Sequence, residues 1–417
     1  MSPTFRALRN PNYRLYVAGS VVSNTGTWMM RVAQDWLVLQ PLHGGGDAVG
    51  IVTGLQFLPV LLLTPYAGVV ADRLPKRVLL QLTQATMGLF SLVSAIAAIT
   101  GHSSLWLVYL CALGLGVGSA FDAPARQSFV SEMVDRDDLT NAVGLNSASF
   151  NVARILGPAL AGLLIAAWGS GQEATGWVFA LNSVSYLAVI VQLRRMNPAL
   201  LHTPLSRVLG RGALVEGIRY VAGRPAMLFV LILVFFAGTF GMNFQLTSAL
   251  MATEVFGKGA GEFGLLGSTM AIGSLTGALM AARRVRIRLR LLALAATGFG
   301  VAEIVAGSLP SYWMFAAFSP AIGFCTLTLL NSANSTMQLS ADPLMRGRVM
   351  ALYMTVVQGG TPIGSPIIGW IGEQYGARWT LWLGGGLVLL GVALAVTLYA
   401  RLREGSLSGL RKALVTF

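Results

Sequence analysis

The stretch Gly68-Val-Val-Ala-Asp72-Arg73-Leu-Pro-Lys76-Arg77 sets a short charged turn between two long apolar runs. Each flanking run is about 20 residues long, the length with which a helix rising about 1.5 Å per residue crosses a bilayer. Charged residues that interrupt such runs belong at the membrane surface. The stretch therefore predicts two consecutive membrane helices joined by a tight loop.

The composition of the whole chain also indicates a membrane protein. Hydrophobic residues make up 55% of the 417 residues, charged residues make up 11%, and the mean hydropathy is +0.68. A soluble domain carries about 25% charged residues. The net charge of +13 raises the alternative of a nucleic-acid partner. The basic residues recur between apolar runs and do not gather in one basic stretch, so we expect no nucleic-acid partner.

The chain contains about twelve apolar segments of spanning length, which predicts an all-α membrane protein with twelve transmembrane helices. The predicted spans are 14–40, 48–70, 78–99, 104–128, 140–168, 176–194, 226–251, 263–283, 289–308, 312–338, 348–372 and 379–402.

The distribution of arginine and lysine predicts the orientation of these helices, because cytoplasmic loops retain basic residues. With the N-terminus inside, only Lys258 and Arg378 fall in outer loops. If one helix were missed or wrongly added, every later loop would be assigned to the opposite side of the membrane. The one-sided distribution of basic residues therefore supports the number of twelve helices. We expect a multi-pass protein of the cell membrane with both termini in the cytoplasm. The small number of lysines beside many arginines indicates a GC-rich bacterial genome.

The longest polar stretch divides the chain into two parts. It predicts an N-terminal six-helix half (1–195), a cytoplasmic linker (196–225), a C-terminal six-helix half (226–403) and a cytoplasmic tail (404–417). Within the linker, Ala213–Ala222 has apolar residues at helical spacing. A helix lying on the membrane surface and a plain linker helix are both open.

A glycine motif occurs at the same position in each half. Gly157-Pro158-Ala-Leu-Ala-Gly162 in the fifth span recurs as Gly364-Ser-Pro-Ile-Ile-Gly369 in the eleventh. Parallel repeats of a transporter leave this kind of trace, and glycines permit close helix packing. A simple kink at Pro158 is the alternative.

The spacing of the charged loop resembles the signature loop between the second and third helices of the major facilitator superfamily. The segments Ala120–Phe129, Asn141–Asn146 and Arg154–Pro158 resemble the branch of enterobactin exporters and macrolide efflux proteins. This resemblance implies two six-helix pseudo-repeats, alternating access and exchange of substrate for protons. It also implies a gating cluster, in which Asp122 serves as an acid for Lys76 or Arg77. The residues of this gating motif are Gly68, Asp72, Arg73, Lys76, Arg77 and Asp122. A generic positive-inside loop is the alternative.

Charged groups inside the membrane are functional candidates because they are costly there. The first helix carries Ser20, Asn24, Thr27, Arg31 and Asp35 on one face. We expect Asp35 to carry the coupling proton, while a permanent i,i+4 ion pair with Arg31 is equally open. Asn151 and Arg154 of the fifth span have the same helical spacing. For Arg154, binding an anionic substrate, pairing with Asp35 and tying helices together are all open. We expect Glu303, near the outer end of a peripheral helix, to reach the interface.

Further polar side chains in the second half can bind cargo or tie helices together. They are Asn243, Gln245, Asn334 and Gln358.

The sequence does not contain the motifs that are typical of other classes of protein. There is no G-x-x-x-x-G-K-[ST] sequence for ATP, and the three histidines fall in loops without a partnering motif. Neither Cys111 nor Cys325 has metal-ligand spacing, so we expect no metal, no cofactor and no enzyme activity.

The sequence thus predicts a monomeric secondary transporter that exports amphipathic small molecules, such as drugs, macrolides or siderophore-like compounds, in exchange for protons. The alternative is a lipid or metabolite transporter that works by import or uniport. A channel or a membrane enzyme is less favoured.

The charge partition makes a topological prediction. A reporter fused after Phe417 is expected in the cytoplasm, and one inserted near Gly259 is expected outside. Fluorescent and phosphatase reporters read the two sides independently. A phosphatase that is active after Phe417 would break the twelve-helix scheme.

Overall fold

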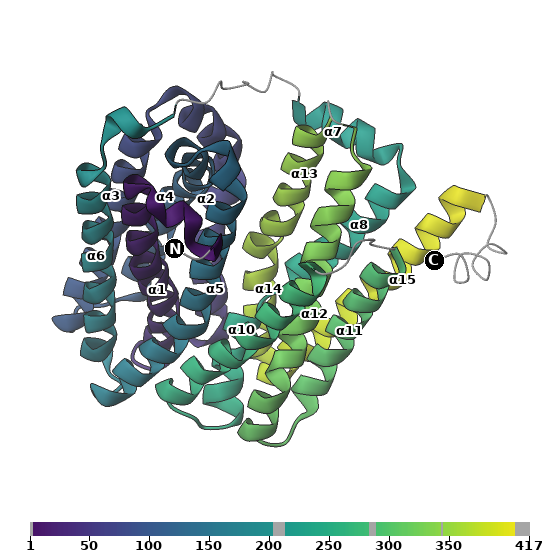
Figure 1. Cartoon of the computed structure of the whole chain (residues 1–417). Helices are drawn as coiled ribbons and strands as arrows, with labels where there is room; N and C mark the ends of the chain where they lie inside the picture. The colour runs from purple at the N-terminus through teal and green to yellow at the C-terminus, as the bar shows by residue number, and fades with distance from the viewer. Residues whose placement is uncertain (1–2, 203–212, 283–288, 343–344, 405–417) are drawn as a thin grey trace. The chain divides into compact units, whose positions relative to one another are not determined.

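The computed structural model describes residues 3–202, 213–282, 289–342 and 345–404, and every regular element in these ranges is a helix (Figure 1). The chain forms two compact units. The first contains Met1–Val208 with Lys258–Ser268, and the second contains Leu209–Gly257 with Thr269–Phe417.

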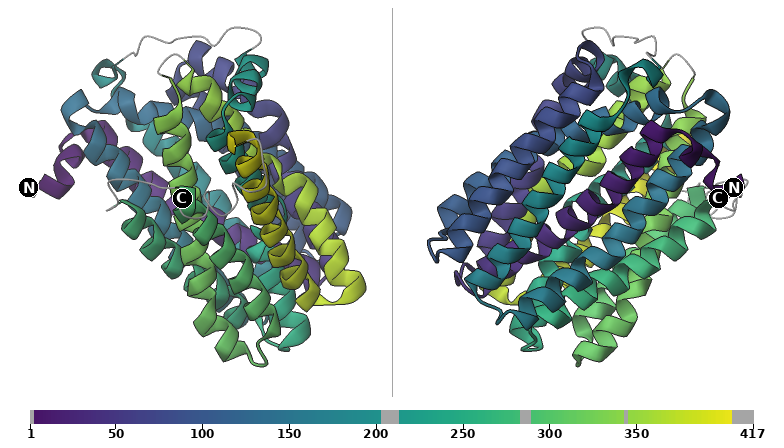
Figure 2. Two further views of the ribbon diagram at one scale, coloured as in Figure 1. Left: turned by 90° about the vertical axis from the view of Figure 1, so that its right-hand side faces the viewer. Right: turned by 60° about the vertical axis from the view of Figure 1, so that its left-hand side comes forward.

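The first unit is built from long helices that follow a short 3-10 helix, η1 (Pro3–Arg9). The long helices are α1 (Pro11–Leu39), α2 (Gly45–Arg73), α3 (Lys76–Ile99), α4 (Leu105–Met133), α5 (Arg136–Ala167) and α6 (Gln172–Arg195). A second 3-10 turn, η2 (Pro198–Leu200), follows them. In this unit α1 packs on α5 and α6, α2 packs on α4, and α3 packs on α4 and α6 (Figure 2).

Local signals explain where several of these helices begin. The Asn10 side chain accepts hydrogen bonds from the Asn12 and Tyr13 amides, and Pro11 occupies the first turn of α1. Ser104 caps α4 in the same manner, accepting from the amide of Leu107.

The second unit begins with α7 (Ala213–Ala222), so the helix predicted inside the linker is confirmed. The other helices that the structure describes after α7 are α8 (Pro225–Phe236), η3 (Ala237–Gly241), α9 (Phe244–Leu250), η4 (Met251–Val255), α10 (Ala260–Ala282), α11 (Leu289–Ser308), α12 (Tyr312–Ser340), α13 (Arg346–Gly359), α14 (Thr361–Tyr375) and α15 (Ala377–Glu404). Helix α10 begins in the first unit and continues in the second. Within the second unit, α15 packs on α11 and α8.

Ten segments of the described chain have the length and hydropathy of a membrane span, and η3, α9 and η4 form one of these with α8. Two more elements complete the predicted set. One is α1, whose 29 residues include the polar face and therefore have a lower hydropathy. The other is the pair α13 and α14, whose separate helices of 14 and 15 residues are each too short to span. The architecture is consistent with twelve spans.

Two predicted spans are not continuous α-helices. The span 348–372 breaks at Gly360, between α13 and α14, because Pro362 in the first turn of α14 has no amide hydrogen to continue the ladder. The span 226–251 contains the π-helical segment η3 and extends to Val255 through η4. Asn243 stabilises the first irregularity, since its amide donates to the carbonyls of Thr239 and Phe240.

The repeated glycine motif makes equivalent contacts in the two units. A Cβ on Gly157 would lie 2.5 Å from the Trp28 Cβ and 3.0 Å from the Thr25 carbonyl of α1. A Cβ on Gly364 would overlap the carbonyl of Thr239. Thr25 and Thr239 have the same offset from the prolines that open their spans. The motif therefore packs the fifth and eleventh spans closely against the first and seventh, which supports the predicted repeat.

Each unit also carries a short lead-in helix that is tied to its bundle. In the first unit, Arg6 of η1 forms an ion pair with Asp138 at the start of α5. In the second unit, Glu216 of α7 lies 3.0 Å from Arg348 at the start of α13, and the Tyr220 hydroxyl donates to Asp342 at 2.6 Å. We call η1 and α7 the lead-in helices below.

The contact at Gly364 makes a stability prediction. Gly364→Ala adds a methyl group where no space exists, so we expect a loss of about 1–3 kcal/mol and a lower melting temperature in detergent. Gly386→Ala in α15 is the matched control, because nothing lies within 4 Å of its Cβ position. Equal melting temperatures for the two variants would contradict the proposed packing.

Candidate functional site

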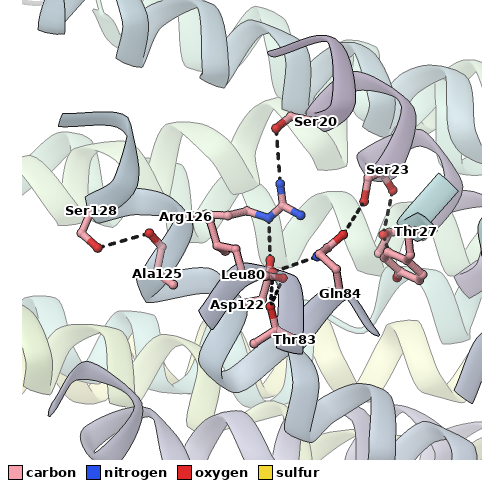
Figure 3. Close-up of polar contacts among 11 residues, drawn as sticks. Ser20, Ser23, Thr27, Leu80, Thr83, Gln84, Asp122, Ala125, Arg126 and Ser128 are labelled. Atoms are coloured by element: carbon pink, nitrogen blue, oxygen red, sulfur yellow. Dashed lines mark hydrogen bonds and ion pairs between the residues drawn. The ribbon is translucent and has the colours of Figure 1, made fainter. Parts of the chain in front are cut away.

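A buried polar network centres on Asp122 of α4, which is 7% exposed (Figure 3). Its Oδ1 accepts hydrogen bonds from Thr83 Oγ1 and Gln84 Nε2 of α3, each at 2.8 Å. Its Oδ2 lies 2.5 Å from Nε of Arg126, one turn further along α4. Three donors thus compensate a carboxylate that would otherwise be costly to bury.

The network continues into α1. Arg126 Nη1 donates to Ser20 Oγ at 3.3 Å, and Ser23 Oγ donates to Gln84 Oε1 at 3.4 Å (Figure 3). Helices α1, α3 and α4 are therefore joined by charge-assisted and neutral hydrogen bonds, which fix their register.

The predicted pairing of Lys76 or Arg77 with Asp122 is wrong. Lys76 Nζ lies 2.5 Å from Glu132 Oε1, near the end of α4, and both side chains are almost fully buried. Asp122 is already neutralised by Arg126. The i,i+4 spacing of Asp122 and Arg126 was the signal that this acid had a local partner.

Arg77 has a different role from the predicted ion pair. Its guanidinium donates to the carbonyl of Leu193 at 2.6 Å and to that of Arg194 at 2.8 Å. These carbonyls belong to the last turn of α6, where a cation also interacts favourably with the helix dipole. Arg77 therefore ties the start of α3 to the end of α6.

The remaining gating residues lie at the end of α2. Arg73 is its last residue and is exposed. The side chain of Asp72 and the surroundings of Gly68 lie outside the described part of the chain, so their predicted roles stay predictions.

The polar face of α1 contacts residues of α2 and α6. Thr27 Oγ1 lies 3.1 Å from the Tyr186 hydroxyl of α6, and Asn24 is half-buried. The Arg31 guanidinium lies 5.0 Å from the ring centroid of Trp28 and 5.4 Å from that of Phe57 on α2.

Among the described residues no salt bridge joins Arg31 and Asp35, the ion pair that the sequence left open as an alternative. Asp35 attracts Arg31 through space and has further interactions within the protein. Asp35 is 2% exposed. The rings of Trp28 and Phe57 hold the guanidinium by cation–π contact.

A cavity of about 60 Å³ lies in the first unit beside this face. Its lining includes Arg31, Phe57, Met30 and Tyr186, together with Gln34 and Gln56. Gln56 Nε2 donates to Gln34 Oε1 at 2.8 Å. Aromatic and methionine surface with a few convergent polar groups is typical of small-molecule sites.

Helix α5 carries the other predicted cavity residues of this unit. Asn151 is half-buried and donates to the Ser147 carbonyl of its own helix at 2.9 Å. Arg154 has two buried guanidinium atoms, Nε and Nη2, without a hydrogen-bond partner among the described residues. Further along α5, Pro158 lies inside the helix, and Gly162 packs on Ala260 at the start of α10.

The predicted polar residues of the second unit mostly bind other helices or their own helix. Asn243 accepts from Ser365 Oγ of α14 at 2.6 Å, and Asn334 accepts from Gln338 of the same helix. Gln245 is half-buried, while Gln358 is exposed. Gly369 is buried in α14. The contacts of Asn243 correspond to the helix-tying alternative.

Glu303 does not reach an interface, contrary to the sequence interpretation. It is 2% exposed, and its Oε2 has no hydrogen-bond partner in the described chain. Its side chain packs against Gly384 and Gly385 of α15. The glycines of α15 create the space for this carboxyl, and no local pattern around Glu303 signalled them.

The chain resembles known transport proteins along almost its whole length. A family model described as "transmembrane secretion effector" matches residues 2–411. The multidrug efflux pump Tap of Mycolicibacterium fortuitum is 30% identical over 403 residues, covering 94% of this chain and 96% of that protein. The enterobactin exporter EntS of Salmonella typhi is 23% identical over 403 residues, covering 93% of this chain and 92% of that protein.

Among solved structures, a bacterial homologue of the human lysosomal transporter Spinster has a similar fold. That structure, in an inward-facing and unoccupied conformation, gives a TM-score of 0.75 at 14% identity, covering 97% of this chain and 98% of that chain. At this identity the likeness concerns the fold alone.

The Lys76–Glu132 pair predicts a charge-swap experiment. Lys76→Glu or Glu132→Lys alone places two like charges in a nearly buried site, so each is expected to cost at least about 3 kcal/mol and lower the melting temperature. The double exchange restores opposite charges and is expected to recover most of the loss. Strictly additive losses in the double variant would rule out a direct interaction.

Proposed function

The chain belongs to the transmembrane secretion effector family of the major facilitator superfamily, and we propose that it exports amphipathic small molecules in exchange for protons. The transporter class and the all-helical fold predicted from the sequence are confirmed. The relatives named above act on drugs and on a siderophore, which supports a substrate of similar character.

The cavity beside α1 is the observation that carries this proposal. It combines an apolar wall, formed by Met30, Phe57 and Tyr186, with the charged end of Arg31. An amphipathic molecule needs both kinds of surface. The buried network around Asp122 and the Lys76–Glu132 pair hold the helices next to this cavity in one arrangement.

Alternating access needs contacts that hold one state and break in the other. We propose that the loop from Gly68 to Arg77 supplies them, and that the buried Lys76–Glu132 pair holds the start of α3 in place on α4 in both states. Asp72 is the acidic residue of this loop. In the proposed mechanism its partner differs between the two transport states. This gating role is separate from substrate binding and is expected to affect turnover without abolishing binding.

Asp35 is the proposed coupling residue. It is a buried carboxyl on the cavity helix, one turn from Arg31. A buried carboxyl inside the membrane can exchange a proton when a conformational change alters its exposure. Arg154, with two buried nitrogens lacking partners among the described residues, is a second polar contact for substrate.

The proposal includes the cellular arrangement. The protein is a monomer in the bacterial cell membrane, with both termini in the cytoplasm, and its two six-helix halves are residues 1–195 and 226–403. The positive charges of the loops support this orientation.

Asp35→Asn tests the coupling. The variant keeps the size and hydrogen-bonding capacity of the side chain but removes its titratable charge. We expect loss of export driven by an imposed pH gradient in proteoliposomes, with binding retained within about threefold. A panel containing a macrolide, a siderophore, an anionic dye and a cationic dye serves as substrate.

Asp47→Asn is the matched control, because Asp47 is an exposed acid in the first turn of α2. Its export is expected to equal that of the wild type. Export by Asp35→Asn with unchanged pH dependence would exclude Asp35 as the coupling residue. If the wild type exported every substrate at a rate independent of the pH gradient, the proton-coupled mechanism itself would be wrong.

A further inference from the structure

Arg31 is held in an unusual manner for a membrane-embedded cation. Its guanidinium carbon lies 5.0 Å from the Trp28 ring centroid and 5.4 Å from the Phe57 ring centroid. The two rings come from α1 and α2, so the aromatic contacts fix the guanidinium between two helices. Contact with ring faces attracts the positive charge but does not satisfy the five N–H donors.

The donors of Arg31 have no fixed acceptor in the described chain. The hydrogen bonds and salt bridges of the described residues do not include its guanidinium, and Asp35 acts on it only through space. Arg126 on α4 is bonded to Asp122 and Ser20. The contrast indicates that Arg126 has a structural role, whereas the N–H groups of Arg31 are available to a ligand.

The guanidinium borders the cavity described above, where it is the charged member of the lining. The remaining lining residues are uncharged, among them Phe57, Tyr186 and the hydrogen-bonded pair Gln34 and Gln56. The cavity volume of about 60 Å³ accommodates one end of a drug-sized molecule and not the whole of it. The site is therefore suited to a terminal group that is negatively charged and attached to an apolar, planar body.

We propose that Arg31 binds the anionic group of the substrate, so that the transported molecules are amphipathic anions carrying a carboxylate or a comparable oxyanion. This inference rests on the proposed transport function and specifies its substrate class. A planar guanidinium presents paired N–H donors that match the two oxygens of a carboxylate. Phe57 and Tyr186 provide the adjoining apolar surface for the ring system of the same molecule.

Two dyes of similar shape and opposite charge test the assignment. Fluorescein carries a carboxylate, whereas rhodamine 123 is a cationic ester with the same tricyclic body. Equilibrium binding of each dye to purified protein in nanodiscs, without a gradient, measures charge selectivity separately from coupling. We expect the wild type to bind fluorescein more tightly than rhodamine 123.

The variants isolate the contribution of Arg31. Arg31→Gln is expected to weaken fluorescein binding at least tenfold and to leave rhodamine 123 binding unchanged or stronger. Arg31→Lys, which keeps the charge but loses the paired donors, is expected to give an intermediate affinity. Arg290→Gln is the control, since Arg290 is exposed at the start of α11 and its removal changes the net charge equally.

A ligand-side change keeps the test valid if a variant does not fold. Fluorescein methyl ester lacks the carboxylate charge, so the wild type is expected to bind it at least tenfold more weakly than fluorescein. On a folded Arg31→Gln variant the two ligands are expected to bind alike. A wild type that does not prefer fluorescein to its ester, or equal weakening of both dyes by Arg31→Gln, would overturn the proposal.

Failure of the anion assignment can be distinguished from failure of the proposed transport mechanism. Loss of charge selectivity with intact gradient-driven export of the substrate panel would remove only the anion assignment. Selective fluorescein binding in a protein without gradient-driven export would leave the binding site standing and remove the proposed coupling.

Discussion

The cost of a charge inside the membrane is the constraint on which this structure depends. Breaking a buried ion pair by removing one partner costs about 3–5 kcal/mol, so a charge at this depth is normally compensated. Asp122 follows this rule with three donors from two helices. The nearly buried Lys76, at the membrane-surface end of α3, is likewise compensated by Glu132. These pairs hold α1, α3 and α4 together and define the part of the first unit that is already satisfied without a ligand.

Three groups depart from the rule. The Arg31 guanidinium has aromatic rings in place of a direct counter-charge, two Arg154 nitrogens have no hydrogen-bond partner in the described chain, and one Glu303 oxygen has none either. Arg31 borders a cavity, which connects its departure to substrate binding. Glu303 instead packs against glycines of α15 in the second unit. The same physical cost therefore separates residues that maintain the fold from residues available for function.

The sequence predicted the spans well because the bilayer imposes a minimum apolar length that is readable locally. It also located the repeated glycine motif, whose contacts with α1 and η3 depend on small size alone. The break at Gly360 had a local signal in the following proline, which the hydropathy pattern concealed. The bonds by which Asn243 stabilises the π-helical segment are local, to carbonyls three and four residues before it, but an asparagine does not by itself signal a π-helix.

The partner of Lys76 was unpredictable because Glu132 reaches it only when α3 packs on α4. For Arg31, the contact with Trp28 follows from helical spacing, but the contact with Phe57 requires the packing of α2.

The lead-in helices bear on how the chain can be divided. Each precedes the first span of its unit, and each is bonded to the start of the fifth span of that unit or its equivalent. A split gene that separates the chain within 203–212 would leave each lead-in helix in the same fragment as the residues that it bonds. A split after Ala222 would transfer the second lead-in helix to the wrong fragment.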